Sequence, residues 1–564
     1  MKKIIMSICA ALSLAACNDD LLDISPSDRI SDNVVWTDPN LIKAYLTNVY
    51  NGLPHGYKIH MQSKMTDECV CTINFGAGII PLGSLSPDNV GSVSIGDWTG
   101  GGNLYNWDDA YKYIRNINLF LDKMTTVDMD NKDEMIAEAK FVRAFIYFDL
   151  LERFGEVPIV DKAYDITSTE TFTSSSFEKV EEFIVKDINE AMVNLPAYYK
   201  STDANFGRAT KSAAQALLSR LYLYAASPLF NESNDRTKWQ AASKAAKDFI
   251  DTYTQYSLYP DYETCFNQPT GRENSEVIFS RNFTTTNGHQ NPMNNLGRRY
   301  GAYGGWWASN GPSQNLVDDY DMKNGKPAFI WNNGVKSVNP ESGYDPQNPY
   351  KDRDPRLDAS VIHDESVYHG DTFEMWISSD ASSWGMDHYK QSGDNPTSGY
   401  QMRKFMPGPS EELSWQVTYT QPWIFFRLAE IYLNYAEAEF ELGHEDVCRE
   451  YINKIRTRAG VGILGSDITG ENLRARLYNE RRIELVFEEH RYFDLRRWKL
   501  AEEVENRPMY GIAITKDVAT GKKTYAEELL VKRVFTNQMY LLPIATSEIR
   551  KNGGTLLQTK TWRK

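Results

Sequence analysis

Helical periodicity dominates two parts of the chain. In the first part, apolar residues recur at intervals of three and four along residues 138–153 and 176–195, which is the spacing of one face of an α-helix. A glycine or a proline follows each segment within two residues, where helices commonly end. Residues 210–226 and 238–253 repeat the pattern. The sequence therefore predicts two helix pairs before residue 255.

The second periodic part, residues 427–460, predicts two helices joined at Gly443. The unit has the length of a tetratricopeptide repeat, about 34 residues. Ala436 and Ala438 are small enough for a partner helix to approach closely, and the aromatic residues around them fill the remaining gaps. The pattern thus indicates a helical-repeat unit.

A repeat stack needs at least about three helix pairs to bury its faces. The segments 138–195, 210–253 and 427–460 supply three, although about 256–425 separates the third from the others. That insertion is rich in Gly, Asn, Pro, Asp and aromatic residues, which predicts loops and short strands. We therefore expect a mostly α fold, a tetratricopeptide-like scaffold of helix pairs with a large loop-rich insertion and few short strands.

The charged segment 480–498 alternates Glu with Arg along a predicted helix. Such a pattern is typical of a solvated, salt-bridged face, and that is the expected environment here. Trp498 at its end and Trp107 in an earlier helix fall on apolar faces, so both are expected in the core.

The N-terminus has the organisation of an export signal. Lys2 and Lys3 precede an apolar run over residues 4–16, which is shorter than the roughly twenty residues that span a bilayer. The run ends in Leu-Ala-Ala before Cys17, which resembles the bacterial lipobox, in which the cysteine becomes the lipid-bearing first residue of the mature protein. The expected regions are a signal peptide at 1–16, a lipidated tether at 17–35 and one body at 36–564, with helical parts at about 36–255 and 426–500, the insertion at about 256–425 and a C-terminal segment at 501–564.

Composition narrows the possible partners. The 564 residues include 61 basic and 76 acidic side chains, a net charge of −15, which becomes −17 once Lys2 and Lys3 leave with the signal. Nucleic acids and anionic membranes are bound through basic patches, so neither is an expected partner. The acidic residues directly behind Cys17 resemble the signal that displays Bacteroidetes lipoproteins on the outer face of the outer membrane. We expect a surface-exposed lipoprotein of the outer membrane, held there by its lipid anchor.

Cysteines and acidic motifs indicate no further chemistry. Cysteines 69, 71, 265 and 448 are too scattered for a disulfide scaffold and are assigned to structure, their pairing left open. The acidic segment 319–325 departs from the EF-hand spacing. The sequence also lacks a G-x-S-x-G elbow, an H-E-x-x-H helix and a Walker loop, so we predict no enzyme, no metal site and no cofactor.

Six segments match one known family in order and spacing. They are 107–119, 138–158, 208–224, 427–460, 480–498 and 540–558. Together they resemble the SusD/RagB family, surface lipoproteins that pair with a TonB-dependent transporter for nutrient uptake. The resemblance implies a tetratricopeptide-like helical part and a variable loop-rich part that bears the ligand site. It also implies capture of an oligosaccharide and a position as a lid on a SusC-like TonB-dependent transporter. Some members bind peptides or other nutrients, so a transporter lid with a non-sugar ligand is the alternative.

The best candidates for ligand contact lie in the insertion. Sugars present flat apolar faces and rings of hydroxyl groups, which suit exposed Trp or Tyr platforms beside polar side chains. Trp306 and Trp307 follow Tyr303 and two glycines, and in an extended segment adjacent side chains point to opposite sides, so one indole should be exposed. The alternative is that these rings plug the loop against the helices. The insertion also carries Trp376, Trp384 and Tyr389, to which no role is assigned.

A second candidate loop, residues 91–105, carries Trp98 between an aspartate and three glycines. Family resemblance places this loop beside the ligand site, with Trp98 and Asn103 as approximate matches to binding residues. Asp67 falls where family members place a ligand-facing acid. The alternatives are a buried Trp98 that locks the loop and an Asp67 that caps a helix.

Overall fold

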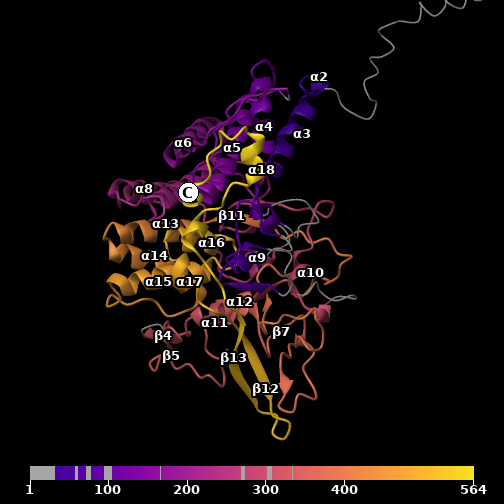
Figure 1. Ribbon diagram of the computed structural model, residues 1–564, viewed down its shortest axis with the longest axis vertical. Helices are drawn as coiled ribbons and strands as arrows, with labels where there is room; N and C mark the ends of the chain where they lie inside the picture. The colour runs from indigo at the N-terminus through magenta and orange to yellow at the C-terminus, as the bar shows by residue number, and fades with distance from the viewer. Residues whose placement is uncertain are drawn as a thin grey trace, which may run out of the picture.

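The structure is a computed structural model in which two kinds of architecture meet (Figure 1). Helices form the upper and left-hand parts of the molecule in this view, and loops with short strands form the lower part and the right-hand side. Cys17 and the predicted signal peptide lie outside the described residues. The residues that the structure describes are 32–57, 61–71, 78–94, 104–165, 167–268, 273–300, 308–332 and 335–563.

The N-terminal helices form where the apolar periodicity predicts them. The Ser176 side chain accepts a hydrogen bond from the Lys179 amide and begins α6, whereas Gly155 ends α5 at a φ of 73°, a conformation that favours glycine. Trp107 is buried against Tyr111 with ring centroids 4.9 Å apart, which confirms its place in the core. The elements are α2 Asp32–Val35, α3 Pro39–Val49, η2 Tyr50–Gly52, η3 Gln62–Met65, β1 Cys69–Cys71, η4 Val90–Ser94, α4 Trp107–Met124, α5 Lys132–Phe154 and α6 Phe177–Asn194.

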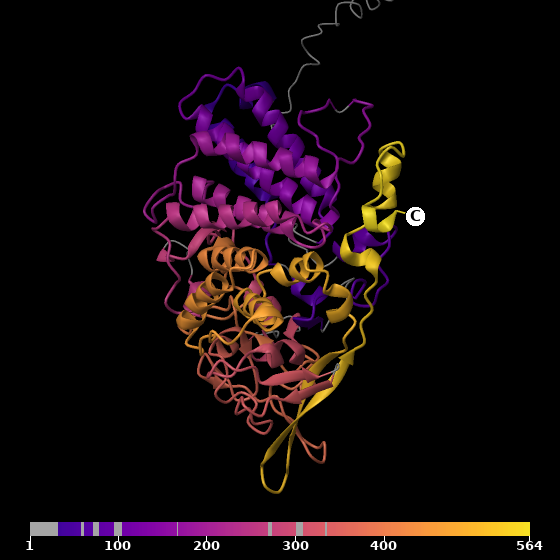
Figure 2. The ribbon, with the colours of Figure 1, turned by 90° about the vertical axis from the view of Figure 1, so that its left-hand side faces the viewer.

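The helical stack continues across the insertion. Helix α13 packs against α8 and α14, although more than 170 residues of chain separate α8 from α13. Figure 2 shows the magenta helices resting on the orange ones. Ala436 and Ala438 are fully buried at this contact region, as their size predicts. The helices are α7 Lys211–Ala226, α8 Arg236–Thr252, α13 Leu428–Glu441, α14 Glu445–Ala459, α15 Gly470–Glu484, α16 His490–Arg497 and α17 Ala501–Val504.

A two-stranded ribbon joins the chain near the start of the insertion to the chain at its end. Strand β2 pairs antiparallel with β11, and Arg427, the last residue of β11, is followed directly by α13. The rest consists of short elements, as the composition predicts. They are α9 Thr264–Asn267, β2 Val277–Arg281, α10 Asn291–Asn295, η6 Arg298–Tyr300, β3 Asn310–Pro312, α11 Gln314–Asp319, β4 Phe329–Asn332, β5 Val335–Val338, α12 Arg356–Ser360, β6 Val361–Ile362, β7 Val367–Tyr368, β8 Asp371–Thr372, β9 Ile377–Ser378, β10 Gln401–Met402 and β11 Trp423–Arg427.

The C-terminal segment runs along most of the length of the molecule (Figure 2). Its hairpin extends the lower end, where β12 pairs with β13 and with β9 of the insertion. The chain then returns to the N-terminal helices, where the Leu542 amide donates to the Arg153 carbonyl at 2.8 Å. The elements are β12 Met509–Lys516, β13 Lys523–Val531, η7 Asn537–Tyr540, α18 Thr546–Lys551 and η8 Lys560–Trp562.

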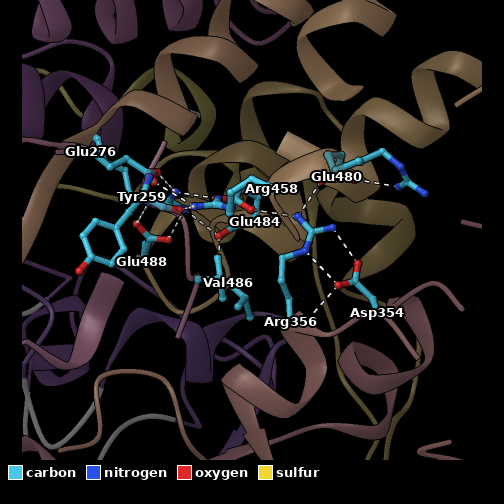
Figure 3. A network of polar contacts seen from close by, with 12 residues as sticks. Tyr259, Glu276, Asp354, Arg356, Arg458, Glu480, Glu484, Val486 and Glu488 are labelled. Atoms are coloured by element: carbon cyan, nitrogen blue, oxygen red, sulfur yellow. Dashed lines mark hydrogen bonds and ion pairs between the residues drawn. The ribbon is translucent and has the colours of Figure 1, made fainter. Parts of the chain in front are cut away.

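A buried network of ion pairs fastens the insertion to the helices (Figure 3). Arg356 of α12 binds Asp354 at 2.7 Å and reaches Glu480 and Glu484 of α15 at 2.6 and 2.9 Å. Glu484 lies between Arg356 and Arg458 and also binds Arg427. The side chains in this network come from the insertion, α14 and α15, so the charges hold two architectures together.

The prediction of a solvated face for residues 480–498 is therefore wrong. Glu480, Arg481, Glu484 and Arg497 are each at most 1% exposed. Trp498 is buried as predicted, and its indole N–H donates to Glu437 at 2.7 Å. Alternating Glu and Arg residues fit a buried helix when other elements supply partners of opposite charge, and that is the arrangement here.

Candidate functional site

A small ribbon brings the segment of Asp67 next to the chain that follows the loop of Trp306 and Trp307. Strand β1 pairs antiparallel with β3, with Val70 opposite Gly311. Beside the ribbon, the Ser313 hydroxyl donates to the Asp67 carbonyl at 2.6 Å, and the Ser313 amide donates to the Glu68 carbonyl at 2.8 Å. The segment around Asp67 thus lies against the residues that follow the Trp306 and Trp307 loop, about 245 positions further along the chain.

Five predicted contact residues, Trp98, Asn103, Tyr303, Trp306 and Trp307, lie outside the described residues. The first residues described after each loop are Leu104 and Ala308, and both are buried. Ser309 accepts a hydrogen bond from Lys64 Nζ of η3 at 2.8 Å. The flank of the loop that carries Trp306 and Trp307 therefore rests on η3.

The chain that follows the second candidate loop is bonded to a different helix. The Leu104 carbonyl accepts a hydrogen bond from Arg153 Nη1 of α5 at 3.1 Å. Helix η3 is itself held by the Glu489 carboxyl group, whose two oxygens accept the Gln62 amide at 2.8 and 2.9 Å. Contact of either loop with a ligand stays a prediction.

Asp67 is the one predicted contact residue that is described, and its carboxylate faces arginines. It is 3% exposed and binds Arg491 at 2.9 and 3.0 Å and Arg482 at 2.7 Å. Burial opposes ionisation, but the two guanidinium groups outweigh it and hold the pKa of Asp67 well below its usual value. The carboxylate joins β1 to α15 and α16 instead of capping a helix, and a ligand contact by Asp67 remains a prediction.

A row of buried amides lies under the β3 side of the site. The Asn310 side-chain oxygen accepts the Met61 amide at 3.2 Å, while its NH₂ donates to Asn295 at 2.5 Å. Asn295 in turn donates to Asn291 at 2.9 Å. These groups are almost completely buried, so their hydrogen bonds fix the base from which the loop emerges.

Two buried acids also lie beneath the site. Burial is the main cause that raises the pKa of Glu68 and of Glu489 to about 8 each. Repulsion by Asp67 adds to the shift of Glu68 and repulsion by Glu68 adds to that of Glu489, while nearby arginines oppose both shifts. Glu68 Oε1 has no hydrogen-bond partner within the part of the chain that is described. Both acids therefore favour the neutral, protonated form at pH 7.

A cavity of about 100 Å³ adjoins this ribbon between Lys64, Cys69 and Arg533. Small-molecule pockets usually hold roughly 300–1,000 Å³, so this cavity by itself does not enclose an oligosaccharide.

Sequence reasoning left one exposed aromatic group without a role. Trp384 and Tyr389, which lie in the insertion, expose 37% and 36% of their surface. Large rings that the fold leaves in water usually mark contact sites. The sequence does show that aromatic residues cluster in 376–389. It does not show which of these rings are exposed, because exposure depends on tertiary packing.

The remaining chemistry of the described residues is structural. Cys69, Cys265 and Cys448 are buried free thiols. Across the described ranges, no group of three or more His, Cys, Asp or Glu side chains is arranged to hold a metal ion. None of the described helices is both long and apolar enough to cross a bilayer.

Comparison with known proteins gives one consistent result. The chain is similar to SusD-like protein P25 of Formosa agariphila, at 26% identity over 71% of this chain and 70% of the relative. It is similar in structure to a SusD-like carbohydrate binding protein from Bacteroides fragilis, with a TM-score of 0.74 and 26% identity over 92% of this chain and 99% of the other. A laminarin binding SusD-like protein shares the fold, with a TM-score of 0.59 and 21% identity over 93% and 99% of the two chains.

Two family models divide the chain between them. The model described as starch-binding, associating with outer membrane, matches residues 20–223. The model of the SusD family matches residues 275–562, which is more than half of the chain and covers the ribbon strand β3, the insertion and the ion-pair network. The helix-pair scaffold, the loop-rich insertion and this match together show that the chain belongs to the SusD family.

Proposed function

We propose that this protein captures oligosaccharide or polysaccharide at the cell surface and delivers it to a partner TonB-dependent transporter of the outer membrane. Membership of the SusD family carries the proposal. The names of two similar proteins, one carbohydrate binding and one laminarin binding, support a sugar ligand.

In this proposal the indoles of Trp98, Trp306 and Trp307 are the sugar platforms, and Tyr303 and Asn103 supply polar contacts. Asp67 supports the site from beneath by fixing β1 against α16. Burying apolar area gains about 25 cal/mol per Å², so a platform of roughly 60–80 Å² contributes about 1.5–2 kcal/mol. For a dissociation constant in the micromolar to millimolar range, loss of two platforms is then enough to abolish detectable binding.

Affinity electrophoresis against starch, laminarin, xylan, mannan and pectin tests the ligand class. The double variant Trp306→Ala/Trp307→Ala should lose retention on the polysaccharide that retards the wild type and keep its melting temperature. Trp331→Ala is the matched control because it removes an indole that is 50% exposed on β4, elsewhere in the insertion. Unchanged retention with a lowered melting temperature would place both rings in the core and the site elsewhere.

The transporter partnership needs a separate experiment. The protein should co-purify with an outer-membrane barrel from membranes dissolved in mild detergent, at native expression. Its recovery alone would argue for a free-standing binding protein. Retention of peptides, with none of the polysaccharides bound, would favour a transporter lid with a non-sugar nutrient.

A further inference from the structure

The insertion contains a tightly folded loop, residues 374–391, that presents aromatic rings to solvent. The Gly385 amide donates to the Trp376 carbonyl at 2.8 Å, and the Asp387 amide donates to the Glu374 carbonyl at 3.0 Å. A Cβ atom at Gly385 would lie 2.2 Å from the Glu374 carbonyl oxygen, so the two arms can approach only with glycine at this position. The loop is therefore a fixed support rather than a loose connection.

The Trp384 ring is anchored through its one polar side-chain atom. Its indole N–H donates to the Gln391 side-chain oxygen at 2.8 Å. The Gln391 amide donates to the His388 carbonyl at 2.9 Å, which closes the turn that carries Tyr389. The residue is nevertheless 37% exposed, and with its N–H already bonded the indole offers apolar carbon to a ligand.

Tyr389 lies in the same turn and is also exposed. Its ring lies 4.4 Å from that of His388, and 36% of the residue is exposed. Trp376 in the same loop differs, because the Lys516 ammonium lies 4.2 Å from the centroid of its ring and covers it. The two rings left open to a flat ligand are thus those of Trp384 and Tyr389.

A shallow cavity of about 150 Å³ adjoins Tyr389, between the turn and strand β12. Lys390 and Glu528 line it, and both residues are exposed. Ammonium and carboxylate groups beside an aromatic ring suit hydroxyl groups, which both donate and accept hydrogen bonds. The surface combines an apolar platform with polar neighbours, the composition that a sugar ring requires.

The loop is fastened to the chain that leads into the Trp306 and Trp307 loop. Arg299 of η6 binds the buried Asp387 through two hydrogen bonds, at 2.6 and 3.0 Å. Asn395 donates to the His388 carbonyl at 3.1 Å and accepts the Arg298 amide at 2.9 Å. The exposed aromatic surface is therefore held next to the start of the proposed ligand loop.

We infer that Trp384 and Tyr389 form a second glycan subsite, which binds a distal part of a chain whose other part occupies the proposed site. The inference rests on the proposed function. The subsite binds by stacking and has few directional contacts, so its contribution grows with the length of the glycan. Short oligosaccharides reach only the main site, whereas a polysaccharide engages both.

Calorimetry with laminarin and with soluble starch, and with laminaritriose and maltotriose, tests the subsite. Trp384→Ala/Tyr389→Ala should bind the polysaccharide recognised by the wild type about tenfold more weakly, while trisaccharide affinity and melting temperature stay unchanged. Trp331→Ala, the control for loss of an exposed indole, should bind as the wild type. Unchanged polysaccharide affinity in the double variant would overturn the subsite.

A second measurement uses only the wild-type protein, so it does not depend on whether a variant folds. Hydrogen exchange of the wild-type amides in 384–391 should slow when the polysaccharide is saturating, and no protection there would overturn the subsite. If the wild type binds neither polysaccharide nor any other of the panel, the proposed function itself fails and the subsite with it. If the double variant binds glycan normally but no longer co-purifies with the barrel, the rings contact protein and the subsite is refuted.

Discussion

Replacing Arg427 with methionine should strongly destabilise the protein. Arg427 is 1% exposed at the junction of β11 and α13, and it binds Glu276 and Glu484 at 2.6 Å and Glu488 at 2.7 Å. Ion pairs link it into one cluster in which six cations balance six anions. These are Arg356, Lys404, Arg427, Arg456, Arg458 and Arg476, against Glu276, Asp321, Asp354, Glu480, Glu484 and Glu488.

Arg427→Met leaves this buried cluster with one uncompensated negative charge. Removing one partner of a buried ion pair usually costs about 3–5 kcal/mol. Unfolding entropy is about 2.1 cal/mol/K per residue, or about 1.2 kcal/mol/K for a chain of this length, so the melting temperature should fall by roughly 3–4 °C. Differential scanning calorimetry of the purified protein measures this directly.

Two companion variants test whether loss of charge balance causes the destabilisation. Arg427→Met/Glu276→Gln restores neutrality, and the glutamine oxygen can still accept the Tyr259 amide, so it should recover part of the loss. Lys244→Met removes an ion pair that is mostly in water, and it should change the melting temperature by less than about 0.5 °C. A single Arg427→Met variant that melts within 1 °C of the wild type, or a double variant less stable than the single, would refute a charge-balanced network.

Three further outcomes follow from the sequence and the site. Cys17→Ala should abolish incorporation of radioactive palmitate and release the protein from the membrane, and label retained by the variant would contradict lipidation at this residue. Asp67→Asn should lower the melting temperature at pH 7 by a few degrees, because Arg482 and Arg491 lose their carboxylate, at a cost of about 3–5 kcal/mol. Glu68 has a pKa of about 8, above the roughly 4.3 of an unfolded glutamate, so the folded protein retains a proton that the unfolded chain has lost between these pH values. Stability should therefore decrease as pH rises through this window, by up to about 1.4 kcal/mol per pH unit, and Glu68→Gln should melt above the wild type at pH 8.5 and level with it at about pH 4. Parallel pH profiles for the two proteins would show that Glu68 does not titrate there.

The sequence by itself determined the features that depend on neighbours along the chain. Helices α5, α6 and α7 follow their apolar periodicity, and the caps at Gly155, Ser176 and Thr210 stand where the pattern ends or begins. Helix geometry is local, because each backbone hydrogen bond spans four residues. The insertion was also recognisable, since composition rich in Gly, Asn and Pro disfavours long helices wherever it occurs.

Tertiary structure alone decided which charges and rings are buried. The alternating Glu and Arg residues of segment 480–498 suit either a solvated surface or a buried network. Glu484 is neutralised there by Arg427 and Arg356, which lie 57 and 128 residues away in the sequence. Asp67 binds Arg491, which lies 424 residues further along the chain. Trp384 and Tyr389 are exposed because other parts of the fold leave them partly uncovered. The free energy of a charge or a ring depends on the groups around it in space, and a local sequence pattern does not specify those groups.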